Sequence, residues 1–170
     1  MMDLINLPQR LYPVGRLDQD TEGLLLLTND GELTNALTHP SYGVERTYVA
    51  LVPGPVRGRT LAELRAGVQL EDGLAKPVRA KVLETQHGKA LLEVVMTEGR
   101  KREVRRMLGH LGLHVERLAR VAFGGVELGD LRQGKWRFLR QPEIAQLHAV
   151  VGGGRAPRGG TGRRGGGGRR

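Results

Sequence analysis

The chain has 170 residues, 39% of them hydrophobic, which is enough for one folded domain, and its formal net charge is +9. It has no cysteine, which excludes disulfides, a thiol nucleophile and a zinc–thiolate site. No apolar run approaches the ~20 residues that cross a bilayer. The first residues also lack the pattern of a signal peptide, so we expect a cytoplasmic protein without a membrane anchor.

The positive charge is unevenly distributed. Residues 151–170 contain six Arg and no acidic residue, whereas the rest of the chain has 21 basic and 18 acidic residues. A basic protein favours a polyanionic partner, with nucleic acid first among them. Because residues 152–170 include ten Gly, we predict a disordered tail. Two interpretations of this tail stand side by side: an electrostatic tether to RNA phosphate, and a solvated end without a specific role.

The first predicted elements are a strand and a short helix. Residues 23–30 (GLLLLTND) have the composition of a buried strand. Asn29 and Glu32 have the spacing of a helix cap, so a short helix is predicted to follow the strand. That helix should end near His39, because Pro40 disfavours helical backbone in the residue before it.

The middle of the chain predicts three strands and a short helix. Residues 45–54 (ERTYVALVPG) alternate like a strand, and residues 61–66 predict one or two helical turns. Residues 77–84 and 89–99 predict an antiparallel pair around the turn at His87-Gly88.

The clearest predicted helix covers residues 101–111. Its apolar residues follow a helical repeat at Val104, Met107, Leu108 and Leu111. Residues 115–124 return to a strand, and Pro142 begins a last helix. Since strands dominate and long helices are few, the predicted class is α+β, with a mixed, mostly antiparallel sheet and flanking helices.

A loop rich in acids, residues 15–23 (GRLDQDTEG), is the first candidate for chemistry. Asp18, Asp20 and Glu22 fall within five residues, immediately before the predicted buried strand. A loop at the end of a strand can hold a reactive group on a rigid scaffold. In such a pocket Arg16 or another cation would offset the negative charge. The other interpretation is a polar turn with local hydrogen bonds.

A cluster of cations is the second candidate. Five of the seven residues 100–106 are basic, and they open the helix predicted at 101–111. Cations at a helix N-terminus oppose its dipole, so a docked phosphate or aspartate would relieve the conflict. The other interpretation is a solvated basic face. His110 and His114 are four residues apart without an acid in a supporting position, so we expect no metal site.

Four segments resemble the RsuA/RluB/RluE/RluF family of RNA pseudouridine synthases. They are PVGRLDQDTEGLLLLTNDGEL, ERTYVALVPG, TEGRKREVRRMLGHLG and VERLARVAFGGVELGDLRQGKWRFL, in the family's order. The resemblance covers roughly residues 11–147 and implies the pseudouridine synthase catalytic fold. Residues 1–150 would be the catalytic domain and 151–170 the tail. Family members usually carry a strand-rich stretch, and many a small RNA-binding domain, before the first motif. The resemblance implies that both are absent here.

The resemblance also assigns roles to residues. It makes Asp18 the catalytic carboxylate, Tyr48 the aromatic residue that stacks on the target base, and Arg105 the partner of Asp18. The remaining implied roles are shaping of the Asp18 loop by Arg16 and Thr21, an apolar contact with the base from Leu118, and RNA binding by Arg100, Lys101, Arg102 and Arg106.

The implied reaction is conversion of uridine to pseudouridine in ribosomal RNA, without a cofactor or metal. Large-subunit RNA is the expected substrate, because the C-terminal segment is most similar to RluB-type members. We expect a monomer. One alternative is a non-catalytic RNA-binding or ribosome-assembly module, which would keep the basic helix and tail without depending on Asp18. A third interpretation is an inactive fragment.

Overall fold

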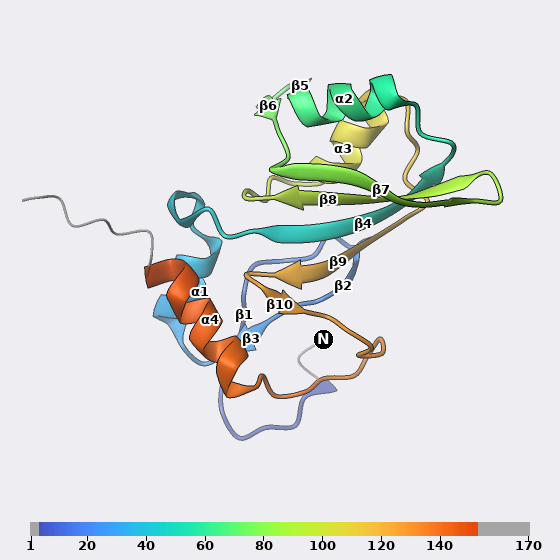
Figure 1. The fold of residues 1–170 in the computed structure, drawn as a ribbon. Coiled ribbons are helices and arrows are strands. Elements are labelled where there is room, and N and C mark those ends of the chain that lie inside the picture. The colour runs from blue at the N-terminus through green and yellow to red at the C-terminus, as the bar shows by residue number, and fades with distance from the viewer. Residues whose placement is uncertain (1–3, 153–170) are drawn as a thin grey trace, which may run out of the picture.

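The computed structural model describes residues 4–152, so the predicted tail lies outside the described residues from position 153 onward. A six-stranded sheet forms its centre (Figure 1). The sheet order is β10 (Val126–Glu127), β9 (Arg117–Phe123), β4 (Arg46–Pro53), β8 (Lys89–Met96) and β7 (Arg79–Gln86), with β2 (Glu22–Gly23) also paired to β9. Only the β2–β9 pairing is parallel. The predicted α+β class with a mixed, mostly antiparallel sheet is therefore confirmed.

Two small sheets and the helices surround this centre. The small sheets pair β1 (Tyr12–Pro13) with β3 (Leu27–Thr28), and β5 (Val68–Leu70) with β6 (Gly73–Ala75). The helices are α1 (Gly31–Thr38), η2 (Pro40–Tyr42, a 3₁₀ turn), α2 (Gly58–Ala66), α3 (Glu103–His110) and α4 (Gln141–Gly152). Helices α2 and α3 lie together on one side of the β7–β8–β4 layer, whereas α1 and α4 pack against each other near β1, β3 and β10 (Figure 1).

Local sequence rules account for several boundaries. The β7–β8 hairpin turns at His87 and Gly88, whose φ angles of 52° and 73° suit a tight hairpin turn. Helix α1 ends at Thr38, with His39 as its C-cap before Pro40, close to the predicted end. Its N-cap is Asp30 rather than Asn29, because the Asp30 carboxylate accepts a hydrogen bond from the Leu33 backbone N–H at 3.0 Å.

The prediction of one continuous strand at residues 23–30 is wrong. The segment pairs first with β9 in parallel, through β2, and then with β1 in antiparallel, through β3. Leu24 and Leu26 are both buried between these short pairings. The apolar run therefore reflects burial beside two different partner strands. Composition alone does not distinguish this arrangement from one long strand.

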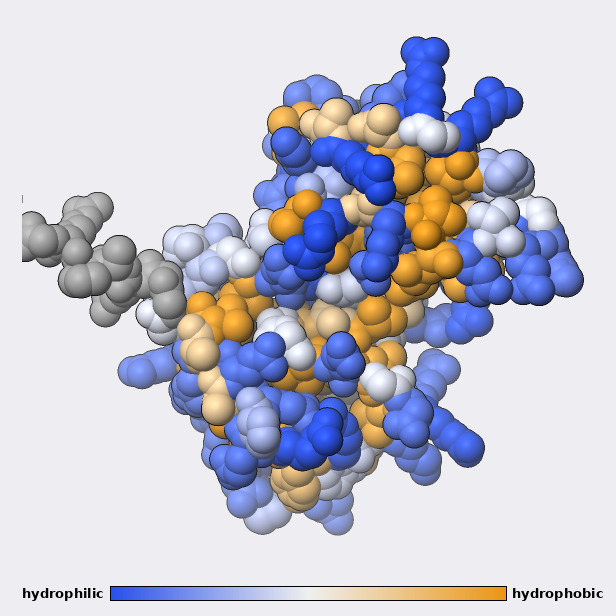
Figure 2. Space-filling view, in the orientation of Figure 1, coloured by the Kyte–Doolittle hydropathy of each residue, from blue (hydrophilic) through white to orange (hydrophobic). Residues whose placement is uncertain are grey.

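Apolar side chains gather in two clusters. The first joins β4 and β8 to α2 and α3 and includes Leu92, Val94, Met107 and Leu108. The second joins the β1–β3 region to α1 and α4 and includes Leu26, Leu37, Phe123 and Leu147. On the face shown in Figure 2, apolar surface appears between α2 and the strands below it, among polar side chains. Among the described residues, none of the helices is long and apolar enough to cross a membrane.

Candidate active site

A small cleft lies where the acidic loop meets the start of α3. Three segments far apart in the sequence supply its walls: the loop before β2, the middle of the sheet, and the loop leading into α3. The lining residues are Arg16, Leu17, Asp18, Thr21, Tyr48, Met96, Glu98, Gly99, Arg100, Arg102, Glu103, Val104 and Leu118. The cleft thus contains seven of the ten residues that the sequence proposed, and Lys101, Arg105 and Arg106 are outside its walls.

The Asp18 loop is held to the sheet by its C-terminal end. The Thr21 backbone N–H donates to the Asp18 carbonyl at 2.9 Å, which closes a turn around the acid. Gly23 then packs directly on the backbone of Arg120, and the Leu24 N–H donates to the Arg120 carbonyl at 2.8 Å. Because β9 fixes residues 22–24, the position of Asp18 depends on a strand almost a hundred residues away.

Asp20, rather than Asp18, pairs with Arg102 and Arg105 at the start of α3. Arg102 Nη1 lies 2.7 Å from Asp20 Oδ1. Arg105 Nη2 donates to the Asp20 carbonyl at 2.6 Å, and Arg105 Nε lies 3.4 Å from Asp20 Oδ2. The Arg102 hydrogen bond lowers the pKa of Asp20 below its usual value. Arg105 therefore has a different acidic partner from the one predicted.

Asp18 carries a carboxylate that is available to a substrate. Among residues 4–152 its side chain accepts no hydrogen bond and forms no ion pair within 4.0 Å. It does act electrostatically on Arg102, whose pKa is raised first by the hydrogen bond to Asp20 and also by the charge of Asp18.

The floor of the cleft comes from one face of the sheet. Tyr48 on β4 lies opposite Arg120 on β9, and Ala50 lies opposite Leu118. A bulge shifts the β4–β9 register between Thr47 and Tyr48. Bulges of this kind re-aim side chains next to binding sites. Period-two alternation accounts for Tyr48 and Leu118 reaching the same cleft from neighbouring strands.

Two buried arginines beneath the cleft were missed by the sequence reasoning. Arg46 and Arg120 are 7% and 2% exposed, and each guanidinium lies 5.0 Å from the Phe123 ring centre. Burial lowers the pKa of both, and the Tyr48 phenol opposes this shift. Arg120 Nε donates to the Leu24 carbonyl at 2.9 Å. Strand alternation could have indicated Arg46, because a residue two positions before Tyr48 on the same strand faces the same side of the sheet.

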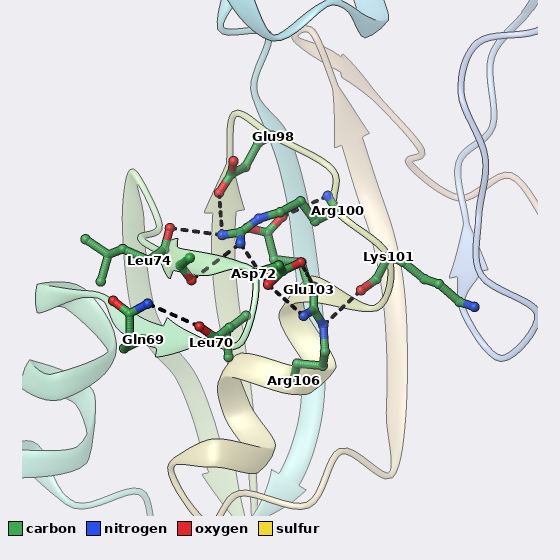
Figure 3. Close-up of polar contacts among 10 residues, drawn as sticks. Gln69, Leu70, Asp72, Leu74, Glu98, Arg100, Lys101, Glu103 and Arg106 are labelled. Atoms are coloured by element: carbon green, nitrogen blue, oxygen red, sulfur yellow. Dashed lines mark hydrogen bonds and ion pairs between the residues drawn. The ribbon is translucent and has the colours of Figure 1, made fainter.

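The basic cluster at α3 is largely neutralised by acids that were also missed. Asp72, in the β5–β6 turn, accepts from Arg100 Nη1 at 2.9 Å and from Arg106 Nη1 and Nη2 at 2.9 and 3.0 Å (Figure 3). Arg100 also contacts Glu98 and Glu103, each at 3.1 Å. Lys101 points away from this network (Figure 3). Glu103 occupies the first position of α3, and its carboxyl group accepts a hydrogen bond from the Arg100 backbone N–H at 3.0 Å.

Glu103 is a buried carboxyl, 4% exposed, in the wall of the cleft. Burial, followed by a hydrogen bond with Glu98, raises the pKa of Glu103 to about 7. The same hydrogen bond lowers the pKa of Glu98. The two carboxyl groups therefore share one proton under mildly acidic conditions.

This pair predicts a pH dependence of stability. The folded chain keeps the Glu103 proton up to about pH 7, whereas an unfolded Glu releases it near 4.5. Raising the pH through that window therefore favours the unfolded state. We expect Glu103→Gln, which cannot ionise, to lose less unfolding free energy than the parent between pH 4.5 and 7 in urea titrations. Parallel profiles for the two proteins would contradict the assignment.

Comparison with known proteins identifies the class of fold. The family model described as RNA pseudouridylate synthase matches residues 2–110. A solved pseudouridylate synthase is 34% identical, with a TM-score of 0.75, and the match covers 85% of this chain and 64% of that one. The α+β fold around the cleft is thus that of an RNA pseudouridine synthase.

The chain belongs to the RNA pseudouridylate synthase family. It is 50% identical over 147 residues to an uncharacterized RNA pseudouridine synthase of Aquifex aeolicus, covering 86% of this chain and 59% of the relative. It is 43% identical over 152 residues to the ribosomal large subunit pseudouridine synthase B of Bacillus subtilis, covering 88% and 62% respectively. The chain thus spans about 60% of the length of these relatives.

Within the described residues, no group of three or more His, Asp or Glu side chains could hold a metal ion. The polar groups of the cleft are carboxylates, guanidiniums, a phenol and a hydroxyl. The Thr21 Oγ1 atom is buried there without a hydrogen-bond partner.

Proposed function

We propose that this chain converts uridine to pseudouridine in ribosomal RNA, with Asp18 as the catalytic carboxylate. One observation carries the proposal: Asp18, Tyr48 and Leu118 come from three separate segments and line one cleft. Family membership supports the reaction type. The name of the B. subtilis relative supports large-subunit RNA as the substrate.

The reaction needs a carboxylate and a confined base. The bond from the sugar C1′ to N1 of uracil breaks, the base turns, and a bond from C1′ to C5 forms. C5 releases a proton and N1 gains one, so no redox step occurs. Asp18 serves this sequence either as a nucleophile at the sugar or as a base that removes a sugar proton. Both routes require the carboxylate of Asp18 rather than its protonated form.

Tyr48 and Leu118 would hold the base while it is detached. Tyr48 offers a flat face for stacking, and Leu118 an apolar contact from the neighbouring strand. Extracting the target base from its stack costs a few kcal/mol. Lys101 and Arg102, both exposed beside the cleft, would offset this cost by binding phosphate. Arg100 and Arg106 would contribute indirectly, because their ion pairs with Asp72 fix the segment that leads into α3.

Arg105 is proposed to act on Asp18 when RNA is bound. Its guanidinium reaches the loop at Asp20, two residues from Asp18, and its side chain is only 13% exposed. Arg105 Nε is buried without a full hydrogen bond. A small shift of the Asp18 loop would replace Asp20 by Asp18 as the carboxylate partner of Arg105. Arg16 and Thr21 would shape the loop that carries this exchange.

The wider setting belongs to the same proposal. Residues 1–150 would form the catalytic domain of a cytoplasmic, monomeric enzyme without a cofactor, and residues 151–170 a basic tail.

The test is to incubate the protein with unmodified large-subunit and small-subunit rRNA transcripts and to map pseudouridine at nucleotide resolution. We expect modification of uridines in the large-subunit transcript. Modification confined to the small-subunit transcript would overturn the substrate assignment. Tight binding of either RNA without any pseudouridine would favour a non-catalytic RNA-binding module instead.

A further inference from the structure

A pair of exposed aromatic rings lies in the segment between β10 and α4. Trp136 is 41% exposed and Phe138 is 71% exposed. Their ring centres are 5.2 Å apart and their planes meet at 86°, an edge-to-face arrangement. Neither ring belongs to either apolar cluster. We infer that this Trp136–Phe138 pair stacks an unpaired nucleotide of the RNA, outside the cleft that holds Asp18. This inference rests on the proposed function.

The pair is presented by a fixed scaffold. Leu128 and Leu139 on either side pack against the second apolar cluster, which turns the two aromatic rings outward. Arg137 donates to Glu143 Oε1 and Oε2, each at 3.0 Å, and to the Phe138 carbonyl at 3.1 Å. The hydrogen bonds from Arg137 and Arg140 lower the pKa of Glu143 to about 2, so Glu143 is ionised at neutral pH. Stacking on a preformed surface loses less conformational entropy than ordering a mobile one.

The charge around the pair selects an anionic partner. Residues 129–140 contain four cations and one acid, Asp130. Glu143 forms ion pairs with two of these cations, Arg137 and Arg140. Arg132 and Lys135 are exposed, and neither forms an ion pair within the part of the chain that the structure describes.

Flat apolar rings beside uncompensated cations match unpaired nucleotides. Such nucleotides expose a base for stacking and a phosphate for ion pairing. A fully paired duplex offers phosphates but hides the faces of its bases. An apolar protein surface would use the rings and leave the cations without partners. None of residues 129–140 lines the Asp18 cleft, so the contact would be a second one on the same RNA.

Trp136 reports on its own site, because it is the only tryptophan of the chain. We would titrate the full chain with an RNA hairpin carrying unpaired flanking nucleotides and record tryptophan emission. The comparison is a blunt duplex of the same length at the same salt concentration. We expect the hairpin to quench the emission and to protect it from acrylamide, and the duplex to do so much less. Equal responses to both RNAs, or no response to either, would overturn the inference.

Variants separate stacking from general attraction. Trp136→Ala and Phe138→Ala should each weaken binding of the hairpin about tenfold, the range for loss of one stacked base. Their single-turnover rate at saturating RNA should stay within about twofold, because the Asp18 cleft is untouched. Leu83→Ala on β7 is the matched control, since Leu83 is also exposed, at 46%, and should change neither quantity. Loss of affinity in all three variants, or in none, would contradict a specific contact.

Two further tests address the cations beside the rings and separate this inference from the proposed function. Replacing Arg132 and Lys135 together by Gln should reduce the salt slope of binding by about 0.7 for each phosphate that no longer pairs with a cation. An unchanged slope would exclude these two cations from phosphate binding.

If the emission of Trp136 changed with protein concentration but not with RNA, the Trp136–Phe138 pair would be a self-association site and the inference would be wrong. If the hairpin quenches Trp136 while no pseudouridine forms, the proposed function fails and the RNA-binding surface stands.

Discussion

Replacing Asp18 by Asn is expected to lower the single-turnover rate of pseudouridine formation by roughly 10³-fold or more, the scale seen when an enzyme loses its reacting group. Asn has nearly the same shape but neither the charge nor the basicity that both chemical routes require. The fold should survive, because the Asp18 side chain makes no hydrogen bond or ion pair with another described residue. Unfolding free energy and RNA affinity, measured beside the rate, should therefore stay close to those of the parent.

Asp20→Asn is the matched control, because Asp20 lies two residues away in the same loop. Its carboxylate holds Arg102 at 2.7 Å and Arg105 Nε at 3.4 Å, so the change loosens the loop without removing the proposed reacting group. We expect a rate loss of roughly tenfold, the order that misplacement of a catalytic group produces. Similar losses in both variants would mean that the loop geometry, rather than the Asp18 carboxylate, limits the reaction.

Replacing Gly23 by Ala is expected to destabilise the chain by about 3 kcal/mol or more. Gly23 has a φ of 107°, a conformation that residues with side chains rarely adopt. A Cβ there would stand 2.7 Å from the backbone N of Arg120, inside van der Waals contact. Neither strand can retreat easily, because Leu24 and Arg120 are hydrogen-bonded through their backbones.

Urea unfolding and single-turnover assays would measure the Gly23→Ala effect. The surviving folded fraction should also react more slowly, since β2 would shift the Asp18 loop. Gly31→Ala is the control, because a Cβ at Gly31 meets nothing within 4 Å. If Gly31→Ala and Gly23→Ala had the same stability, close packing of β2 on β9 would not anchor the loop.

The sequence predicted those features that depend on neighbouring residues. The β7–β8 hairpin, the end of α1 near His39 and the amphipathic α3 follow from turn residues, a proline and a helical repeat. The motifs also named Asp18, Tyr48 and Leu118 from three segments, and these three residues line one cleft in the structure.

The ionic partners could not be predicted in the same way. Asp20 meets Arg102 across 82 positions, and Asp72 meets Arg106 across 34. No local pattern fixes such pairs, since any exposed acid could serve an exposed arginine. The prediction for residues 23–30 failed for a related reason, because its two halves pair with β9 and β1, which lie far apart in the sequence. Long-range pairing therefore marks the limit of prediction from one sequence.

The parallel pairing of Glu22–Gly23 with residues 119 and 120 also bears on how the molecule matures. A chain emerging from the ribosome presents the aspartate early, yet the strand that docks its loop is made about a hundred residues later. Contacts between such distant segments form slowly, because a large loop must close first. In a nascent chain the loop that carries Asp18 therefore cannot dock on its partner strand until β9 (Arg117–Phe123) has been synthesised.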